Sequence, residues 1–267
     1  MKQTFRNEFL YQVFALIVCV IVVHAFYVSN VRPRAAEILA EQALQMQEDA
    51  TFTPERSVWV LIRDFEQEAC FILMLWAFAI MAYKAWSAIR ERALLERDLV
   101  PVGDGVRILP DDTREYARSL QSLPDGFRSL LLPRVLLSSL ERFGSTHSVQ
   151  DVSSVANTLC ESEGERLESE LSMIRYIAWA IPSVGFIGTV RGIGQALGEA
   201  HRAVEGDIAG VTENLGVAFN STFIALLISI VVMFAVHQLQ SLQERQVFDT
   251  QRYVDHNLIR HMKGRDA

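Results

Sequence analysis

Two threonines lie in the most apolar parts of the chain, where a hydroxyl group can take part in ion transfer. Thr189 lies in a run dense in glycine, and Thr222 lies in a stretch of Val, Ile, Leu and Phe. A threonine hydroxyl both donates and accepts hydrogen bonds, so each one offers a polar group inside an apolar helix. Threonines in helices also act as packing residues that bond back to their own turn. The spacing alone leaves both interpretations open.

Small residues accompany both threonines at helical spacing. The first stripe is Gly185, Gly188, Gly192 and Ala196, and the second is Ala218, Thr222, Ala225 and Ser229. Within lipid, small residues let two helix backbones approach closely. We therefore predict that the glycines and alanines pack the two segments against each other.

Other chemistries have no residues to support them. The apolar segments contain no Asp or Glu at their cores, and the chain has no His-x-x-x-His pair, cysteine cluster, Ser-His-Asp set or phosphate loop. We expect no enzyme activity, no metal and no cofactor. Cys19, Cys70 and Cys160 form no CxxC pair and are interpreted as packing residues. A lone His24 is more typical of an interfacial anchor than of a ligand.

Four segments can cross a membrane. Half of the residues are hydrophobic, yet the mean hydropathy is only +0.18, so apolar runs must alternate with polar ones. The four runs are Phe9–Val28, Ala69–Trp86, roughly Tyr176–Leu197, and Leu215–His237. Lys84, near the end of the second, can snorkel. We predict an all-α polytopic membrane protein whose last two helices extend into a cytoplasmic bundle.

Charge in the loops predicts the orientation. Residues 29–68 carry four basic and eight acidic side chains, whereas residues 87–171 contain ten arginines and the tail after His237 has five basic residues. Positive charge favours the cytoplasmic side, so both termini are expected there, in a bacterial inner membrane. The first run is too long for a cleaved signal peptide, and no small-x-small site follows it. The net charge of −7 argues against nucleic-acid binding.

The predicted organisation has six parts. They are a signal-anchor span (1–28), a periplasmic helical hairpin (29–68), a second span (69–86), a cytoplasmic helical region (87–171), spans three and four (172–240) and a cytoplasmic C-terminal helix (241–267).

Local patterns add detail outside the spans. The hairpin is predicted as a helix over Ala35–Gln47 and a second helix that is capped at Thr53–Glu55 and runs straight into the second span. Asp111–Phe143 is predicted as two short helices. A long helix starts at Ser148, with a near capping box, and continues without a break into span three. The acidic stretch Glu161–Glu170 is interpreted as a solvated face, with a subunit contact or a cation-attracting vestibule as alternatives.

The run from Gly185 to Ile193 resembles the Gly-x-x-Gly-Thr-Val-x-Gly-Ile signature of the MotA/TolQ/ExbB proton-channel family, and the TolQ/ExbB branch is the more similar. The stretch from Leu215 to Ile230, with Thr222 inside it, resembles the last span of that branch. The resemblance covers about Met173–Gln240. It implies that Thr189, Thr222, Ser229 and Arg191 border an ion pathway.

The family resemblance also implies partners and a mechanism. It implies a homopentamer around a dimer of a single-span, ExbD/TolR/MotB-like protein that carries an essential Asp. Protonation of that Asp drives rotation of one part against the other, so proton-motive force becomes mechanical work. The missing carboxylate of this chain would then be supplied by the partner.

Two features depart from the family pattern. Four spans match the MotA branch rather than the three spans of TolQ and ExbB, and Arg191 stands where a Trp is common. Arg191 either snorkels or pairs between subunits, or else tunes the partner's Asp within the ion path. Proton or sodium, and the machine that is driven (outer-membrane transport, motility or defence), stay open. A non-conducting membrane scaffold is the main alternative function. A transporter with a broken helix at Pro182-Ser183 would require inverted repeats, and none is evident.

Overall fold

A computed structural model describes residues 2–48, 57–103 and 106–263 of the chain. The chain gathers into two compact units: residues 1–82 with 173–236 form unit 1, and residues 83–172 with 237–267 form unit 2. Every regular element in the described ranges is a helix, apart from an isolated bridge between Ile108 and Met262. Four helical stretches are long and apolar enough to cross a membrane: Glu8–Met46, Phe65–Leu95, Val149–Gly198 and Ala209–His261. The predicted all-α fold with four spans is confirmed.

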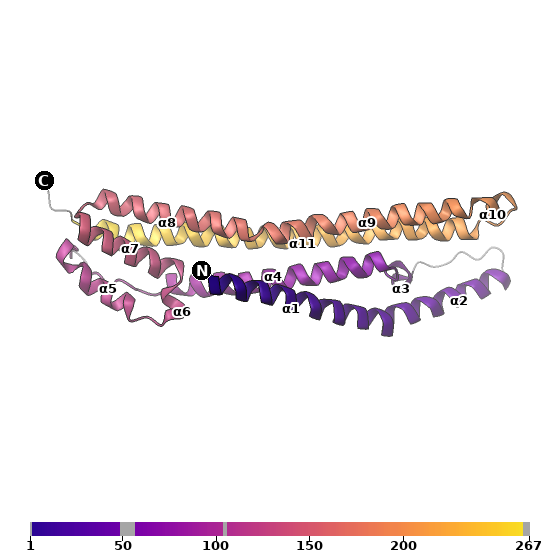
Figure 1. Cartoon of the computed structure of the whole chain (residues 1–267), viewed down its shortest axis with the longest axis horizontal. Coiled ribbons are helices and arrows are strands. Elements are labelled where there is room, and N and C mark those ends of the chain that lie inside the picture. Colours follow the sequence, from indigo (N-terminus) through magenta and orange to yellow (C-terminus); the bar gives the residue numbers. More distant parts are fainter. Residues whose placement is uncertain (1, 49–56, 104–105, 264–267) are drawn as a thin grey trace. The chain divides into compact units, whose positions relative to one another are not determined.

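The N-terminal part of unit 1 is one continuous helical stretch. Helix α1 (Lys2–Phe26) passes through a π-helical segment, η1 (Tyr27–Val31), into α2 (Arg32–Glu48), which confirms the helix predicted over Ala35–Gln47. Helix α1 packs along α4 (Phe65–Leu95), as Figure 1 shows. The Tyr11 hydroxyl donates to the Ala79 carbonyl at 3.1 Å, and Trp76 Nε1 donates to the Gln12 carbonyl at 2.9 Å. These bonds use backbone carbonyls, so they hold the two helices in one register.

The second outer helix was predicted wrongly. A four-residue helix, α3 (Val58–Leu61), ends at a turn, and α4 begins only at Phe65 after the irregular segment 62–64. The predicted cap at Thr53–Glu55 lies outside the described residues. The interruption matters because α4 starts four residues before the predicted span, so Glu66 and Glu68 belong to its first turn.

The last two spans of unit 1 pack side by side. They are α9 (Ser172–Gly198) and the first part of α11 (Ala209–Asn257), joined through the short α10 (Ala200–Val204) (Figure 1). A Cβ on Gly185 would lie 2.5 Å from the Ala225 Cβ, and one on Gly188 would lie 2.5 Å from the Ser221 Cβ. At Gly192 the obstacle is backbone, since the Ala218 nitrogen would be 2.7 Å away. The two backbones therefore approach too closely for any side chain at these positions.

Gly192→Ala should separate α9 from α11, because its new methyl group meets a backbone nitrogen that cannot rotate away. We expect a destabilisation of about 1–3 kcal/mol, typical of overpacking, seen as a lower thermal unfolding midpoint in detergent. Gly194→Ala is the matched control: it lies in the same helix and has nothing within 4 Å of the new Cβ. It should be neutral or slightly stabilising, because alanine is the better helix former. Equal effects of the two changes would mean that close packing does not determine the stability.

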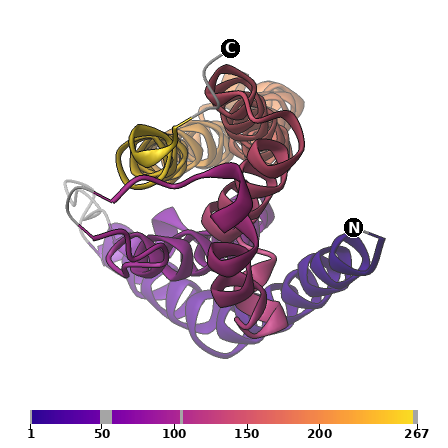
Figure 2. The same ribbon diagram turned by 90° about the vertical axis from the view of Figure 1, so that its left-hand side faces the viewer.

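Unit 2 is built on a helical hairpin of α7 (Leu131–Thr146) and α8 (Val149–Glu170). His147, with a φ of 57°, ends α7, and the Ser148 hydroxyl accepts from the Asp151 amide at 3.2 Å, which confirms the predicted cap. Val152 and Ala156 of α8 share the core with Val254 of α11, and Figure 2 shows these helices end on. Cys160 is buried in the same core, and burial raises the pKa of its thiol to about 11.

The remaining helices of unit 2 are short. They are the 3-10 turns η2 (Pro110–Asp112) and η3 (Ile259–His261), together with α5 (Thr113–Gln121) and α6 (Asp125–Arg128). The region predicted as two short helices thus holds α5 and α6, and it also holds most of the 16-residue α7, so that prediction was wrong in number and length. Leu171 forms a turn between α8 and α9. The helix that was predicted to continue without a break is therefore interrupted at this residue.

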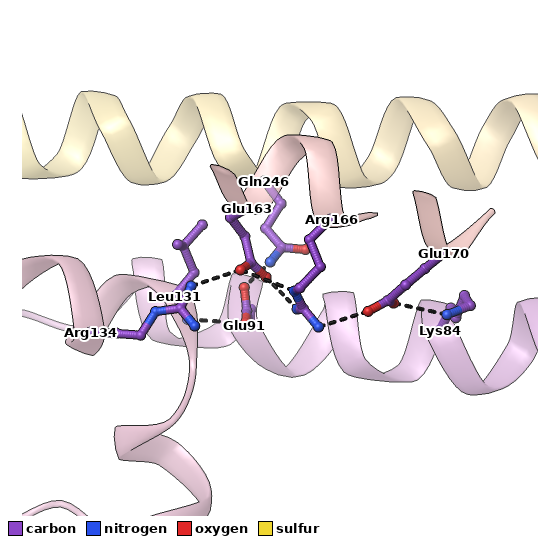
Figure 3. Close-up of polar contacts among 8 residues, drawn as sticks. All are labelled: Lys84, Glu91, Leu131, Arg134, Glu163, Arg166, Glu170 and Gln246. Atoms are coloured by element: carbon purple, nitrogen blue, oxygen red, sulfur yellow. Dashed lines mark hydrogen bonds and ion pairs between the residues drawn. The ribbon is translucent and has the colours of Figure 1, made fainter. Parts of the chain in front are cut away.

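The acidic stretch of α8 is not simply a solvated face. Glu163 is buried and accepts hydrogen bonds from Arg134, at 2.7 Å, and from Arg166 (Figure 3). Glu170 accepts from Arg166 at 2.7 Å and from Lys84 at 2.9 Å. Lys84 is itself buried, so the prediction that it snorkels was wrong. The five side chains form one row of alternating charge that joins α4, α7 and α8 within unit 2.

Glu163→Gln should destabilise the α7–α8 hairpin at neutral pH. Burial alone would raise the pKa of Glu163, but hydrogen bonds from Arg166 and Arg134 outweigh it and leave that pKa below its ordinary value of 4.5. The ionised form is therefore favoured in the folded state, and its contribution is present above pH 4.5 and disappears as the pH falls through the lowered pKa.

We expect hydrogen exchange in α7 and α8 to report a loss of about 1–2 kcal/mol at pH 7 and a smaller loss at acidic pH. Glu161→Gln, at an exposed position of the same stretch, is the control and should change little. A loss that is independent of pH would contradict the assignment to Glu163 ionisation.

Candidate functional site

The two threonines meet where α9 and α11 pack together. The Thr189 and Thr222 hydroxyls are hydrogen-bonded to each other. Thr189 Oγ1 also lies 3.1 Å from the Ala218 carbonyl of α11, and Thr222 Oγ1 lies 3.1 Å from the Gly185 carbonyl of α9. Both residues are half-buried. Each hydroxyl has one hydrogen, so this cross-helix set leaves acceptor capacity free for a further donor.

The other small residues fall into two groups. Ala225 faces Gly185, and Ala218 faces Gly192, so each alanine lies opposite a glycine of the neighbouring helix. Ser229 lies two turns further along α11, where its hydroxyl donates to the Ala178 carbonyl at 3.4 Å. The structure therefore brings the two threonines together and does not place Ser229 with them.

Arg191 forms an ion pair that the sequence analysis missed. Its Nε and one terminal nitrogen donate to the two carboxylate oxygens of Glu66, each at 2.7 Å. The Glu66 side chain is 10% exposed and that of Arg191 is 37% exposed. The partner is thus in the same chain, an arrangement that neither interpretation of Arg191 considered. The sequence analysis assigned Glu66 to the outer loop. Its position just before the second apolar run was the signal that could have placed it in the helix.

A buried amide follows Glu66 in the sequence. Gln67 is fully buried, and its Nε2 donates to the Leu61 carbonyl at 3.2 Å and lies 3.4 Å from the Ser221 hydroxyl. Its Oε1 has no hydrogen-bond partner among the described residues. Ser221 directly precedes Thr222 and faces Gly188. A buried polar contact therefore joins the start of α4 to the residue of α11 that precedes Thr222.

Glu68 holds the π-helical segment η1 in place. Its carboxylate lies 2.7 Å from His24 Nδ1 and 2.5 Å from Arg32, so it bridges the residues on either side of η1. His24, interpreted from the sequence as an interfacial anchor, has a specific carboxylate partner. Among the described residues, no group of three or more His, Cys, Asp or Glu side chains could hold a metal ion.

These features define a multi-pass helical membrane protein in which two glycine-packed spans carry a pair of hydrogen-bonded threonines. Residues 129–252 match the model of the MotA/TolQ/ExbB proton channel family. The match includes all of α7, α8, α9 and α10 and the greater part of α11, so the resemblance seen in residues 185–193 is confirmed. Over this segment, just under half of the chain, the protein is similar to the MotA/TolQ/ExbB family. None of the curated proteins compared with the chain matches it.

Glu66→Gln should destabilise unit 1, because it leaves the Arg191 guanidinium without its counter-charge. Removing one member of a buried pair costs about 3–5 kcal/mol, and the partial exposure of Arg191 should reduce the loss to roughly 2 kcal/mol. Thermal unfolding in detergent measures it. The double change Glu66→Gln with Arg191→Gln should recover most of the loss.

Glu213→Gln is the control for this pair. Glu213 accepts from Arg63 at 2.8 Å, but its side chain is 60% exposed, so the expected cost is below about 1 kcal/mol. A double variant as unstable as Glu66→Gln alone would show that charge neutralisation is not the role of this pair.

Proposed function

We propose that this chain is the ion-channel subunit of a motor in a bacterial inner membrane, and that it conducts protons. The observation that carries the proposal is the hydrogen-bonded pair of Thr189 and Thr222 on two closely packed spans, within a segment that matches a proton-channel family. Five copies would surround a dimer of a single-span, ExbD/TolR/MotB-like partner. Both termini and residues 87–171 would lie in the cytoplasm, and residues 29–68 outside.

The proposed mechanism assigns the charge carrier to the partner and its solvation to this chain. The partner's membrane Asp takes up a proton, becomes neutral, and is then able to move past the apolar faces of α9 and α11. A threonine hydroxyl that turns away from its backbone carbonyl donates to the ionised carboxylate, and the free lone pairs accept from the neutral acid. A proton moving down the membrane potential releases about 2.3 kcal/mol per 100 mV, which is available for rotation.

A second candidate function is a non-conducting membrane scaffold. It is favoured by one observation: both threonine hydroxyls already lie within hydrogen-bonding distance of backbone carbonyls of their own chain, at 3.1 Å. In that case the hydroxyls only hold α9 against α11. The two functions make opposite forecasts for substitutions that keep the shape of threonine and remove its hydroxyl.

Thr189→Val and Thr222→Val distinguish channel from scaffold. In the complex reconstituted into liposomes, each change should reduce potential-driven proton flux by about tenfold or more. Native mass spectrometry should still give the mass of a pentamer with the partner bound. Thr→Ser at either site keeps the hydroxyl and should keep most of the flux.

Three outcomes would count against the channel. Normal flux in the double valine variant would show that both residues serve only to pack the helices. Loss of the partner or of the pentamer in the valine variants would mean that the threonines hold the assembly together. A wild-type complex without any proton flux would leave the scaffold as the function.

A further inference from the structure

A second set of polar side chains surrounds the start of α4 in unit 1. We call it the α4 entry cluster; it consists of Arg63, Asp64, Glu66, Gln67, Arg191 and Ser221. Most of its hydrogen-bonding groups have partners: Arg191 binds both oxygens of Glu66, Arg63 binds Glu213, and Gln67 Nε2 binds the Leu61 carbonyl. Two buried oxygen atoms have none among the described residues, and they suggest what the cluster binds.

Asp64 holds the first of these atoms. Its side chain is 15% exposed, and its Oδ2 is shielded from solvent without a hydrogen-bond partner among the described residues. The nearest cationic contact is Arg63 Nε, 3.8 Å from Oδ1, which is too long for a hydrogen bond. Asp64 directly precedes α4, where an aspartate usually accepts from an amide of the first turn, yet no such bond forms here. A carboxylate in this setting is poorly stabilised.

The second atom is Gln67 Oε1, which is also buried and has no partner among the described residues. Asp64 and Gln67 are three residues apart at the beginning of a helix, a spacing that puts two side chains on the same helix face. Two acceptors at this spacing cannot bond to each other. One added proton on Asp64 turns an acceptor into a donor, which can then satisfy Gln67 Oε1.

The charged surroundings of Asp64 are mixed. Burial is the main cause that raises the pKa of Asp64, and the carboxylates of Glu66 and Glu213 raise it further. Arg63 and Arg191 act in the opposite direction and do not reverse the shift. The Tyr27 hydroxyl of η1 also interacts electrostatically with Asp64. Asp64 therefore binds a proton at a higher pH than an ordinary aspartate does.

Glu66 differs from Asp64 although both belong to the cluster. Both oxygens of Glu66 accept from Arg191, so this carboxylate has the hydrogen-bonded charged partner that Asp64 lacks. The pair instead cancels the positive charge of Arg191, two residues from Thr189. A cation that approaches the threonine pair thus meets a neutral pair rather than an arginine.

We propose that Asp64 is a proton-binding residue of the ion pathway, which takes up a proton at the α4 entry cluster before it reaches the threonine pair. Beyond Asp64, Gln67 Nε2 lies 3.4 Å from the hydroxyl of Ser221, which directly precedes Thr222 in α11. On uptake the carboxylate becomes a carboxylic acid that donates to Gln67 Oε1, and on release it returns to the carboxylate. The role of this proton in ion conduction rests on the proposed function. The binding of a proton by Asp64 does not.

Infrared titration of the purified complex tests proton binding directly. The wild type should show a buried carboxylic acid that loses its proton above the ordinary aspartate value of 3.8. Asp64→Asn resembles the neutral form, so it should fold and should lack this signal. Glu213→Gln removes an exposed acid that interacts with the same site and should retain it. A signal that persists in Asp64→Asn would overturn the proposal, as would one displaced by Na⁺ at constant pH.

Proton flux in liposomes tests the role. Asp64→Asn should lower it by about a hundredfold at neutral pH while the pentamer and partner stay bound. Asp64→Glu, which keeps an acid, should recover part of it, and Glu213→Gln should leave it nearly unchanged. Normal flux in Asp64→Asn would remove Asp64 from the pathway. A wild type without flux would refute the proposed function alone, because the infrared result still decides whether Asp64 binds a proton.

Discussion

The close approach of the α9 and α11 backbones is the constraint on which unit 1 depends. Gly188 and Gly192 lack the Cβ atom that would hold the helices apart, and Ser221 and Ala218 fill the space opposite them. At this separation the threonine hydroxyls of the two helices reach each other. The Glu66 side chain also lies against Gly188, since a Cβ there would be 3.1 Å from its Cγ. The absence of a few methyl groups thus positions both the hydroxyls and the ion pair.

Charge inside the molecule follows a common rule in both units. A buried carboxylate is costly unless it is paired and hydrogen-bonded. In unit 1, Glu66 is paired with Arg191, and Glu68 is paired with Arg32 and His24. In unit 2, Glu163 and Glu170 are held by the alternating row in Figure 3. Asp64 departs from this rule because it is largely buried without such a partner, which is why it is the candidate for binding a proton.

The part of this arrangement that could be predicted is the part that depends on local spacing. The 3.6-residue period and the length of the apolar runs were sufficient for the four spans, and the Ser148 cap followed from its neighbours. The small-residue stripe indicated where two helices would meet. The ion pair of Glu66 and Arg191 joins residues 125 positions apart, and no local pattern connects them. The break before Phe65 and the pairing inside Glu161–Glu170 were missed for the same reason, since tertiary packing decides them.

The pairing of Arg191 with Glu66 has an electrical consequence. A lone arginine that moved across the full membrane would exchange about 2.3 kcal/mol with a 100 mV potential. The bound pair carries no net charge, and its opposite charges are separated by only about a tenth of the hydrocarbon thickness. Reorienting it therefore exchanges roughly a tenth of that energy, well below thermal energy at 298 K. Swings in membrane voltage would act on a mobile proton and leave this part of the helix bundle almost unaffected.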